Sequence, residues 1–126
     1  MRAYVLALET RDAACCVVQQ LEDRAVLTAS LNQLLRAASS IGANIAEGYA
    51  RSTGTERARF FEYSLGSVRE TKHCYGTIAS FLDRTFLDAE SARHSEMTRL
   101  LIVMVRRQRA FGAKRLQESD SDYAVS

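Results

Sequence analysis

Residues 33–48 have the sequence QLLRAASSIGANIAEG. In and just before this segment, apolar residues recur at alternating spacings of four and three: Leu27, Leu31, Leu34, Ala38, Ile41 and Ile45. Such a repeat is typical of a helix that packs lengthwise against other helices. Between these positions lie Ser39, Gly42, Ala43 and Ala46, whose small side chains let a neighbouring helix approach closely. The segment therefore predicts a long helix inside an all-α bundle.

The pattern continues at spaced positions further along the chain. The positions that form a recognisable motif are Gln33, Arg36, Ala37, Ala38, Ser40, Ile41, Ala43, Asn44, Ile45, Ala46, Glu47, Gly48, Arg51, Arg57, Phe60, Gly66, Ser67 and Glu70. In this motif the chain resembles the bacterial four-helix-bundle family of proteins encoded in intervening sequences of large-subunit ribosomal RNA genes, a family related to the accessory variability proteins of diversity-generating retroelements. The resemblance implies an antiparallel up-down four-helix bundle, assembled as a ring-shaped homopentamer with a positively charged surface. In retroelement-linked relatives such a ring binds structured nucleic acid and the reverse transcriptase, and the resemblance implies the same kinds of partner here.

Length and composition predict one domain. The chain has 126 residues, enough for a single modest core. We expect the bundle to span 1–116, and 117–126 to form a polar, acidic and disordered tail. Three of the 15 acidic residues lie in that tail, which leaves 17 basic residues against 12 acidic ones in the bundle. Fifteen of the basic residues are arginine. That bias suits phosphate binding, although a GC-rich genome would also produce it.

The sequence also predicts a cytoplasmic location. No apolar run approaches the roughly 20 residues that cross a bilayer. The apolar N-terminal segment is interrupted by Glu9, Arg11 and Asp12 before any site that resembles a signal-peptide cleavage site. The three cysteines, Cys15, Cys16 and Cys74, are an odd number on helical and mostly apolar faces. We expect them to be buried and reduced.

Four helices account for most of the chain. We expect the first over residues 4–23, with Leu6, Cys16, Val17 and Leu21 facing inward, and the second over 28–48, closed by Gly48 in a left-handed turn. The third begins with Thr53 or Thr55 as its N-cap, has Glu56 in its first turn and reaches Leu82. The fourth begins with Asp88 as its cap and continues to Phe111 or Leu116.

The third predicted helix has an unusually wide apolar stripe. Two neighbouring rows run along it: Phe61, Leu65, Val68, Tyr75, Ala79 and Leu82, and beside them Phe60, Ser64, Thr71, Cys74, Ile78 and Phe81. A stripe of this width indicates more than one apolar neighbour. Together with the apolar residues of the fourth helix, it predicts apolar surface in excess of one bundle core, and hence association into an oligomer.

Basic residues follow the last two helices. The candidate nucleic-acid contacts are Arg57, Arg69, Lys72, Arg99, Arg106, Arg107 and Arg109. Residues 89–117 contain seven basic residues against two acidic ones, and like charges spaced four apart on a helix repel each other. The run therefore needs a counterion, which is either nucleic-acid phosphate or an acidic row supplied by the tail or by another subunit. Since neither an aromatic platform nor a compact helix-turn-helix is present, we expect little sequence preference.

A polar row lies beside the apolar seam of the second predicted helix. It consists of Ser40, Asn44, Glu47 and Arg51. We interpret it as a structural polar seam, in which Asn44 and Glu47 bond to the third helix or to a neighbouring subunit and Arg51 neutralises Glu47. The alternative is a catalytic carboxylate. That alternative lacks a second acid and a nucleophile at a matching spacing.

Metal and nucleophile chemistry have weak support in the sequence. Glu70 and His73 form one Glu-x-x-His string, whereas a di-iron bundle needs two such strings and two further glutamates. Cys74 follows His73 directly, so the two side chains diverge by about 100° on a helix and cannot form a catalytic pair. We therefore expect no metal, no cofactor and no enzymatic activity. The leading hypothesis is an oligomeric accessory protein that binds structured RNA or DNA, and the alternative is a homo-oligomeric interaction scaffold with no nucleic-acid role.

Overall fold

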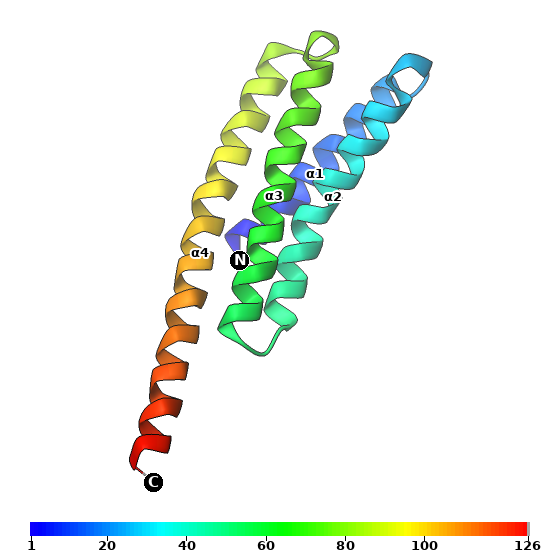
Figure 1. The fold of residues 1–126 in the computed structure, drawn as a ribbon. Coiled ribbons are helices and arrows are strands. Elements are labelled where there is room, and N and C mark those ends of the chain that lie inside the picture. The colour runs from blue at the N-terminus through cyan, green and yellow to red at the C-terminus, as the bar shows by residue number, and fades with distance from the viewer. Residues whose placement is uncertain (126) are drawn as a thin grey trace.

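The computed structural model describes the backbone of residues 1–125 and the side chains of residues 1–118. Four long helices make up the chain: α1 (Arg2–Leu21), α2 (Thr28–Ala50), α3 (Gly54–Ile78) and α4 (Arg84–Val125). Short 3₁₀ segments, Ala25–Leu27 and Ala79–Phe81, lie in the first and last connections. The helices alternate in direction, and the described residues contain no strand (Figure 1). The predicted all-α up-down four-helix bundle is confirmed.

The two outer elements, α1 and α4, complete the bundle by lying against each other. Arg2 of α1 bonds to Glu96 of α4 at 3.1 Å, and the Thr10 hydroxyl lies 3.9 Å from the Met97 sulfur. Of the residues expected to face inward from the first helix, Leu6, Val17 and Leu21 are buried, but Cys16 is exposed. The expectation of three buried cysteines therefore holds only for Cys74, with Cys15 half-buried.

The turn between α2 and α3 shows one prediction confirmed and one wrong. The Thr53 hydroxyl caps α3 by accepting a hydrogen bond from the Glu56 amide at 3.2 Å, as expected. Gly48, however, does not end α2, which continues to Ala50, and no described glycine has a positive φ. A Cβ at Gly48 would lie 2.6 Å from the Phe61 ring. This glycine is therefore explained by the close approach of α3, and not by a turn.

Helix α3 lies between α2 and α4, as Figure 1 shows, and this position explains its wide apolar stripe. Leu65 is only 8% exposed and belongs to a core cluster that includes Ile41 of α2 and Met97 of α4. A second cluster near the other end of the bundle includes Leu31, Tyr75 and Ile78. Both rows of α3 are therefore used largely inside one chain. Because contacts within one chain explain the width of the stripe, the width is not evidence for association.

Helix α4 begins earlier than expected and extends past the bundle. It starts at Arg84, so Asp88 lies inside the helix, where it accepts a bond from Arg84 at 3.2 Å instead of acting as the cap. Its C-terminal part continues beyond the turn that joins α2 and α3 (Figure 1). Most of the side chains of the expected tail at 117–126 lie outside the described residues: those beyond Glu118, together with the whole of Ser126. The boundary at 116 and the disorder of the tail therefore stay predictions. Within the described part of the chain, no helix is long and apolar enough to cross a membrane.

Candidate nucleic-acid interface

The part of α4 that follows Leu101 has an exposed basic surface. We call its five basic residues, Arg106, Arg107, Arg109, Lys114 and Arg115, the basic end of α4; all five are exposed. Arg109 forms an ion pair with Glu62 of α3. The other four have no acidic partner among the residues whose side chains are described. The basic end therefore presents mostly uncompensated positive charge.

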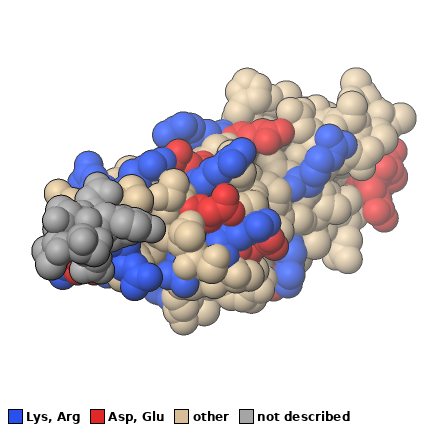
Figure 2. Space-filling view, turned by 60° about the horizontal axis from the view of Figure 1, so that its bottom comes forward, with Lys and Arg blue, Asp and Glu red and all other residues tan. Residues whose placement is uncertain are grey.

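Figure 2 shows how these charges lie on the surface. Lys and Arg side chains lie near one end of the face shown and also across its middle. Further along the same face, acidic side chains lie among the basic ones. Ion pairs such as Arg51 with Glu47 account for part of this mixing. On the face shown, the basic side chains of a single chain therefore extend over much of the surface, are interrupted by acidic ones and do not form a continuous belt.

Two glycines bring the start of α3 against the backbone of α4. A Cβ at Gly54 would lie 2.4 Å from the Gln108 carbonyl oxygen and 3.0 Å from the Gly112 nitrogen. A Cβ at Gly112 would lie 3.1 Å from the Thr55 hydroxyl oxygen. Because any side chain at Gly54 would collide with backbone, the close contact depends on this residue being glycine. The contact places the N-terminus of α3 beside the basic end of α4.

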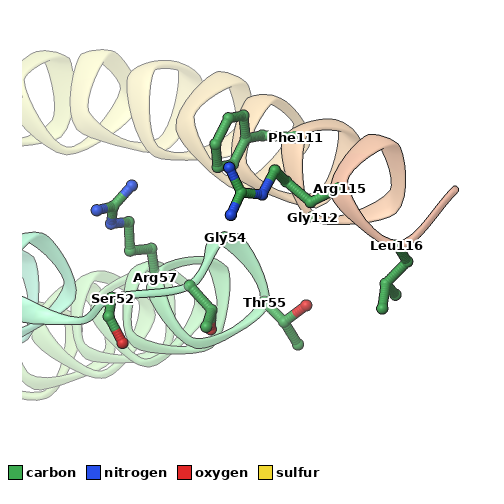
Figure 3. Close-up of a pocket in the computed structure, with 9 residues that line it drawn as sticks. Ser52, Gly54, Thr55, Arg57, Phe111, Gly112, Arg115 and Leu116 are labelled. Atoms are coloured by element: carbon green, nitrogen blue, oxygen red, sulfur yellow. The ribbon is translucent and has the colours of Figure 1, made fainter. Parts of the chain in front are cut away.

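A pocket of about 390 Å³ opens at this junction, and we call it the α3–α4 pocket. Its lining residues are Ser52, Thr53, Gly54, Thr55, Arg57, Phe111, Gly112, Arg115 and Leu116. Arg57 extends from α3 and Arg115 from α4 into the space between the two helices (Figure 3). Among the described residues, hydroxyl groups line the pocket and no carboxylate does. Its polar character is therefore cationic.

Local contacts position both arginines of the pocket. The Arg57 Nε donates a hydrogen bond to the Arg51 carbonyl oxygen at 2.9 Å, which fixes the side chain near the end of α2. The Arg115 guanidinium lies 6.0 Å from the centre of the Phe111 ring, at the outer limit of a cation–π contact. Neither arginine has an acidic partner among the described side chains. Both guanidinium groups are therefore available to an anion.

The structure brings only some of the predicted contact residues together. Arg57 lies in the α3–α4 pocket, and Arg106 and Arg107 lie on the basic end of α4. Lys72 lies elsewhere, lining a smaller pocket of about 180 Å³ with Glu90 and His94. The remaining candidates, Arg69, Arg99 and Arg109, are exposed, and Arg109 is engaged by Glu62. The seven candidates therefore do not form one site, and the Arg57–Arg115 pairing is visible only in three dimensions.

The polar row on α2 has a different bonding pattern from the expected one. The Ser40 and Ser67 hydroxyl groups bond across α2 and α3 at 2.5 Å, but the Asn44 side-chain amide donates to the Ser40 carbonyl oxygen of its own helix at 2.9 Å. Arg51 lies 2.6 Å from Glu47, as predicted. Within the chain, Glu47 does not reach α3 and its side chain is 49% exposed. Of the four residues in the row, Asn44 and Glu47 therefore make no described side-chain bond to α3, whereas the Ser40 side chain bonds to it directly.

Arg51 instead connects α2 to the first turns of α3. Besides Glu47, it lies 3.8 Å from Glu56. Its guanidinium stacks over the Phe60 ring at 4.6 Å from the ring centre. Its carbonyl oxygen accepts the bond from Arg57. Arg51 therefore holds the turn that carries the α3–α4 pocket.

A buried polar cluster between α3 and α4 was not expected from the sequence. Tyr75, Glu90 and His94 are each no more than 4% exposed. The Glu90 carboxylate forms an ion pair with Arg93, and its other oxygen lies 3.5 Å from His94 Nε2. Burial, and next the charge of Glu90, raise the pKa of the Tyr75 phenol above its ordinary value. The spacing of four between Glu90 and His94 is the signal in the sequence that could have revealed this pair.

The remaining chemical candidates lie apart. Glu70 and His73 are both exposed on α3. Within the described residues, no three His, Cys, Asp or Glu side chains gather as metal ligands would. Burial, and then the nearby charge of Glu70, raise the pKa of the Cys74 thiol. This shift disfavours the reactive thiolate.

The fold and the arginine-rich end define a class, that of all-α bundle proteins with a basic end surface. Within that class, the chain belongs to the family of the 23S rRNA-intervening sequence protein, whose model matches residues 1–103. Phe111, Gly112 and Arg115 lie beyond the matched residues. The family match therefore does not include the α4 side of the pocket.

A similar fold occurs in a solved structure. It is the crystal structure of a protein with unknown function from the S23 ribosomal protein family of Bacteroides thetaiotaomicron VPI-5482. The two sequences are 20% identical, the match covers 82% of this chain and 97% of the other, and the TM-score is 0.76. At this identity the likeness shows the fold alone. No curated protein matches the sequence.

Proposed function

We propose that this protein is a non-enzymatic, oligomeric accessory protein of the cytoplasm that binds the backbone of structured RNA or DNA with little sequence preference. The observation that supports this proposal most directly is the basic end of α4. Four of its five basic residues have no acidic partner among the described side chains. Arginine on a rigid helix offers forked donors that match phosphate oxygens. Phosphate contacts of this kind give affinity without reading the bases.

The family to which the chain belongs is a second support for this proposal. The name of the family refers to the intervening sequence of 23S ribosomal RNA. This name links the family to an RNA gene but does not name a ligand of this chain. By resemblance to the accessory variability proteins, a reverse transcriptase is a further proposed partner. The proposal assigns no catalytic role to this chain in such a complex.

Assembly into a ring, most simply a homopentamer, is the second part of the proposal. The supporting observation is an apolar surface on α1 and α2, where Met1, Tyr4, Ala46 and Tyr49 line a pocket of about 360 Å³. Tyr49 is 51% exposed there, although large aromatic side chains usually lie inside or at interfaces. In a ring, several basic ends would bind one nucleic acid together, and avidity would strengthen a weak individual contact.

The alternative function is a homo-oligomeric scaffold with no nucleic-acid role. The same apolar surface supports it, and so does the ion pair of Arg109 with Glu62, because it shows that part of the basic run is neutralised inside the chain. In this alternative, the remaining arginines would meet acidic groups of another subunit. The two functions therefore differ in what neutralises the basic end.

The test is the affinity of the purified protein for an unrelated structured RNA and for a DNA duplex, measured by fluorescence anisotropy at about 50 mM and about 200 mM salt. Several phosphate contacts should weaken binding by orders of magnitude over this range. We expect binding at the lower salt with little difference between sequences. An absence of binding at about 50 mM salt, with light scattering showing a stable oligomer, would favour the scaffold instead.

A further inference from the structure

The α3–α4 pocket has features that are not required for binding an internal phosphodiester of a nucleic acid. It is about 390 Å³ in volume, within the usual range of small-molecule sites. Two arginines enter it from different helices (Figure 3). Hydroxyl-bearing residues and the half-exposed Phe111 ring complete its walls. These features describe a bounded anion site at one end of a larger basic surface.

We infer that the α3–α4 pocket binds a phosphate monoester, either at the phosphorylated end of a nucleic-acid strand or on a free nucleotide. This inference rests on the proposed function and names the chemical group that the pocket selects. A monoester has a charge of about −1.5 to −2 at pH 7, because its second pKa is about 6. An internal phosphodiester has a charge of −1. The guanidinium groups of Arg57 and Arg115, neither of which has an acidic partner among the described side chains, therefore match the charge of the monoester and exceed that of the diester.

The geometry of Arg57 favours this ligand. Its Nε is already bonded to the Arg51 carbonyl oxygen, so the side chain is held in place before any ligand arrives. Terminal guanidinium nitrogens remain for forked bonds to phosphate oxygens. Because Arg57 is half-buried, its charge is less screened by solvent than that of a fully exposed arginine. A ligand that neutralises it therefore gains more than at the open surface.

Arg115 provides the second charge from the opposite wall. Its guanidinium lies on the pocket side of α4, 6.0 Å from the centre of the Phe111 ring (Figure 3). The first amide groups of any helix lack intrahelical acceptors, so the start of α3 adds donors to the same wall as Arg57. The apolar Phe111 and Leu116 side chains, which are 48% and 65% exposed, can contact the sugar or base attached to the phosphate. The pocket thus suits a phosphate that has an organic substituent on one side only.

The experiment compares one short single-stranded RNA with a 5′-hydroxyl and the same RNA with a 5′-phosphate, each labelled at the 3′ end. Binding is measured by fluorescence anisotropy at one fixed salt concentration. We expect the phosphorylated strand to bind about tenfold more tightly, since one added charge-assisted contact is worth about that factor. Arg57→Gln and Arg115→Gln should each abolish the difference. Arg24→Gln, which removes an exposed arginine near the opposite end of the bundle, should preserve it.

Competition by adenosine 5′-monophosphate, with adenosine as its control, separates the two sources of the monoester. If the mononucleotide binds with the same dependence on Arg57 and Arg115 and no RNA binds, the pocket takes free nucleotides and the proposed nucleic-acid function fails. If both RNA strands bind equally, the inference is overturned while the proposed function stands. If neither RNA nor nucleotide binds, both are overturned. Thermal melting of each variant confirms that a loss of binding is not a loss of fold.

Discussion

The two halves of α4 differ in the burial and pairing of their charged side chains. In residues 84–101, Glu90 and His94 are each 2% exposed, and Arg93 pairs with both Glu90 and Glu9. In residues 102–118, none of the side chains is fully buried, and Leu116 is 65% exposed. Only Arg109 of the basic end has an acidic partner among the described residues. The first half of α4 therefore contains a buried and paired set of charges besides exposed ones, whereas all charged residues described in the second half are exposed.

The difference separates charges that serve the fold from charges available to a partner. A buried ion needs a partner and hydrogen bonds, because losing water around it costs several kcal/mol. The Glu90–Arg93 pair meets that need with residues of the chain itself. An exposed run of like charges has no such need, but its members repel one another until a counterion binds. The basic end is therefore the part of α4 on which an external anion would have the largest effect.

The largest expected effect is a loss of unfolding free energy when a packed side chain is truncated in the first half of α4, compared with the same truncation in the second half. Met97 is fully buried against α1 and α3, whereas Phe111 is 48% exposed. Met97→Ala should lower the free energy of unfolding by about 2–5 kcal/mol, because it removes a buried side chain and leaves a cavity. Phe111→Ala should change it by no more than about 0.5 kcal/mol. Urea unfolding of the two variants measures both effects, and equal losses would show that the second half of α4 is packed as firmly as the first.

A smaller effect tests the buried ion pair. Glu90→Gln leaves Arg93 with Glu9 alone, at 3.5 Å, and should cost about 1–3 kcal/mol of unfolding free energy. The matched change in the other half, Arg106→Gln, removes an exposed charge that has no acidic partner among the described residues. It should leave stability unchanged or slightly raised. A stable Glu90→Gln protein would mean that the cluster is held for a purpose other than the fold.

An exposed ion pair should matter less than the buried one. Glu47 and Arg51 lie 2.6 Å apart, but their side chains are 49% and 40% exposed. Glu47→Gln should therefore cost less than about 1 kcal/mol, the usual limit for solvent-screened pairs. Thermal melting at low and at high salt checks this value. A larger loss that persists at high salt, accompanied by a change in oligomer size, would place Glu47 at a subunit interface.

The smallest effect at neutral pH concerns Tyr75, whose hydroxyl has no hydrogen-bond partner among the described residues. Tyr75→Phe should change stability by less than about 0.5 kcal/mol at pH 7, or raise it slightly. Burial raises the pKa of this phenol above 10.0, so its contribution to stability is present below pH 10 and is lost as the pH rises above it. The variant should therefore be less sensitive than the wild type between about pH 10 and pH 11. Identical alkaline unfolding of both proteins would contradict the burial of Tyr75.

The sequence predicted the positions of the helices well but predicted several of their ends wrongly. The periodic apolar residues of α2 and the Thr53 cap appear in the structure where they were expected, because both depend on local spacing. Gly48 and Asp88 were assigned to helix ends although both lie inside helices. Glycine at a close helix crossing and glycine at a turn look alike in sequence. Only the contact with Phe61 distinguishes them.

The candidate site was even less visible in the sequence. The basic run of α4 could be read directly, but the pairing of Arg57 with Arg115 depends on the contact of Gly54 with Gly112. These residues are more than fifty positions apart, and no local pattern links them. The neutralisation of Arg109 by Glu62 was likewise hidden, because it joins two helices. Tertiary contacts, and not spacing, decide which of the arginines are available.

The most direct test of the central claim is the salt dependence of DNA-duplex binding for two variants that lose the same charge. In Arg106→Gln/Arg107→Gln both changes lie on the basic end of α4, whereas in Arg11→Gln/Arg84→Gln both remove exposed arginines that have acidic partners, Asp12 and Asp88. Each lost phosphate contact lowers the slope of log affinity against log salt by roughly 0.9. We predict a slope reduced by roughly 2 for the first variant and unchanged for the second. Equal changes in the two slopes, or no change in either, would contradict the claim that the basic end of α4 is the nucleic-acid surface.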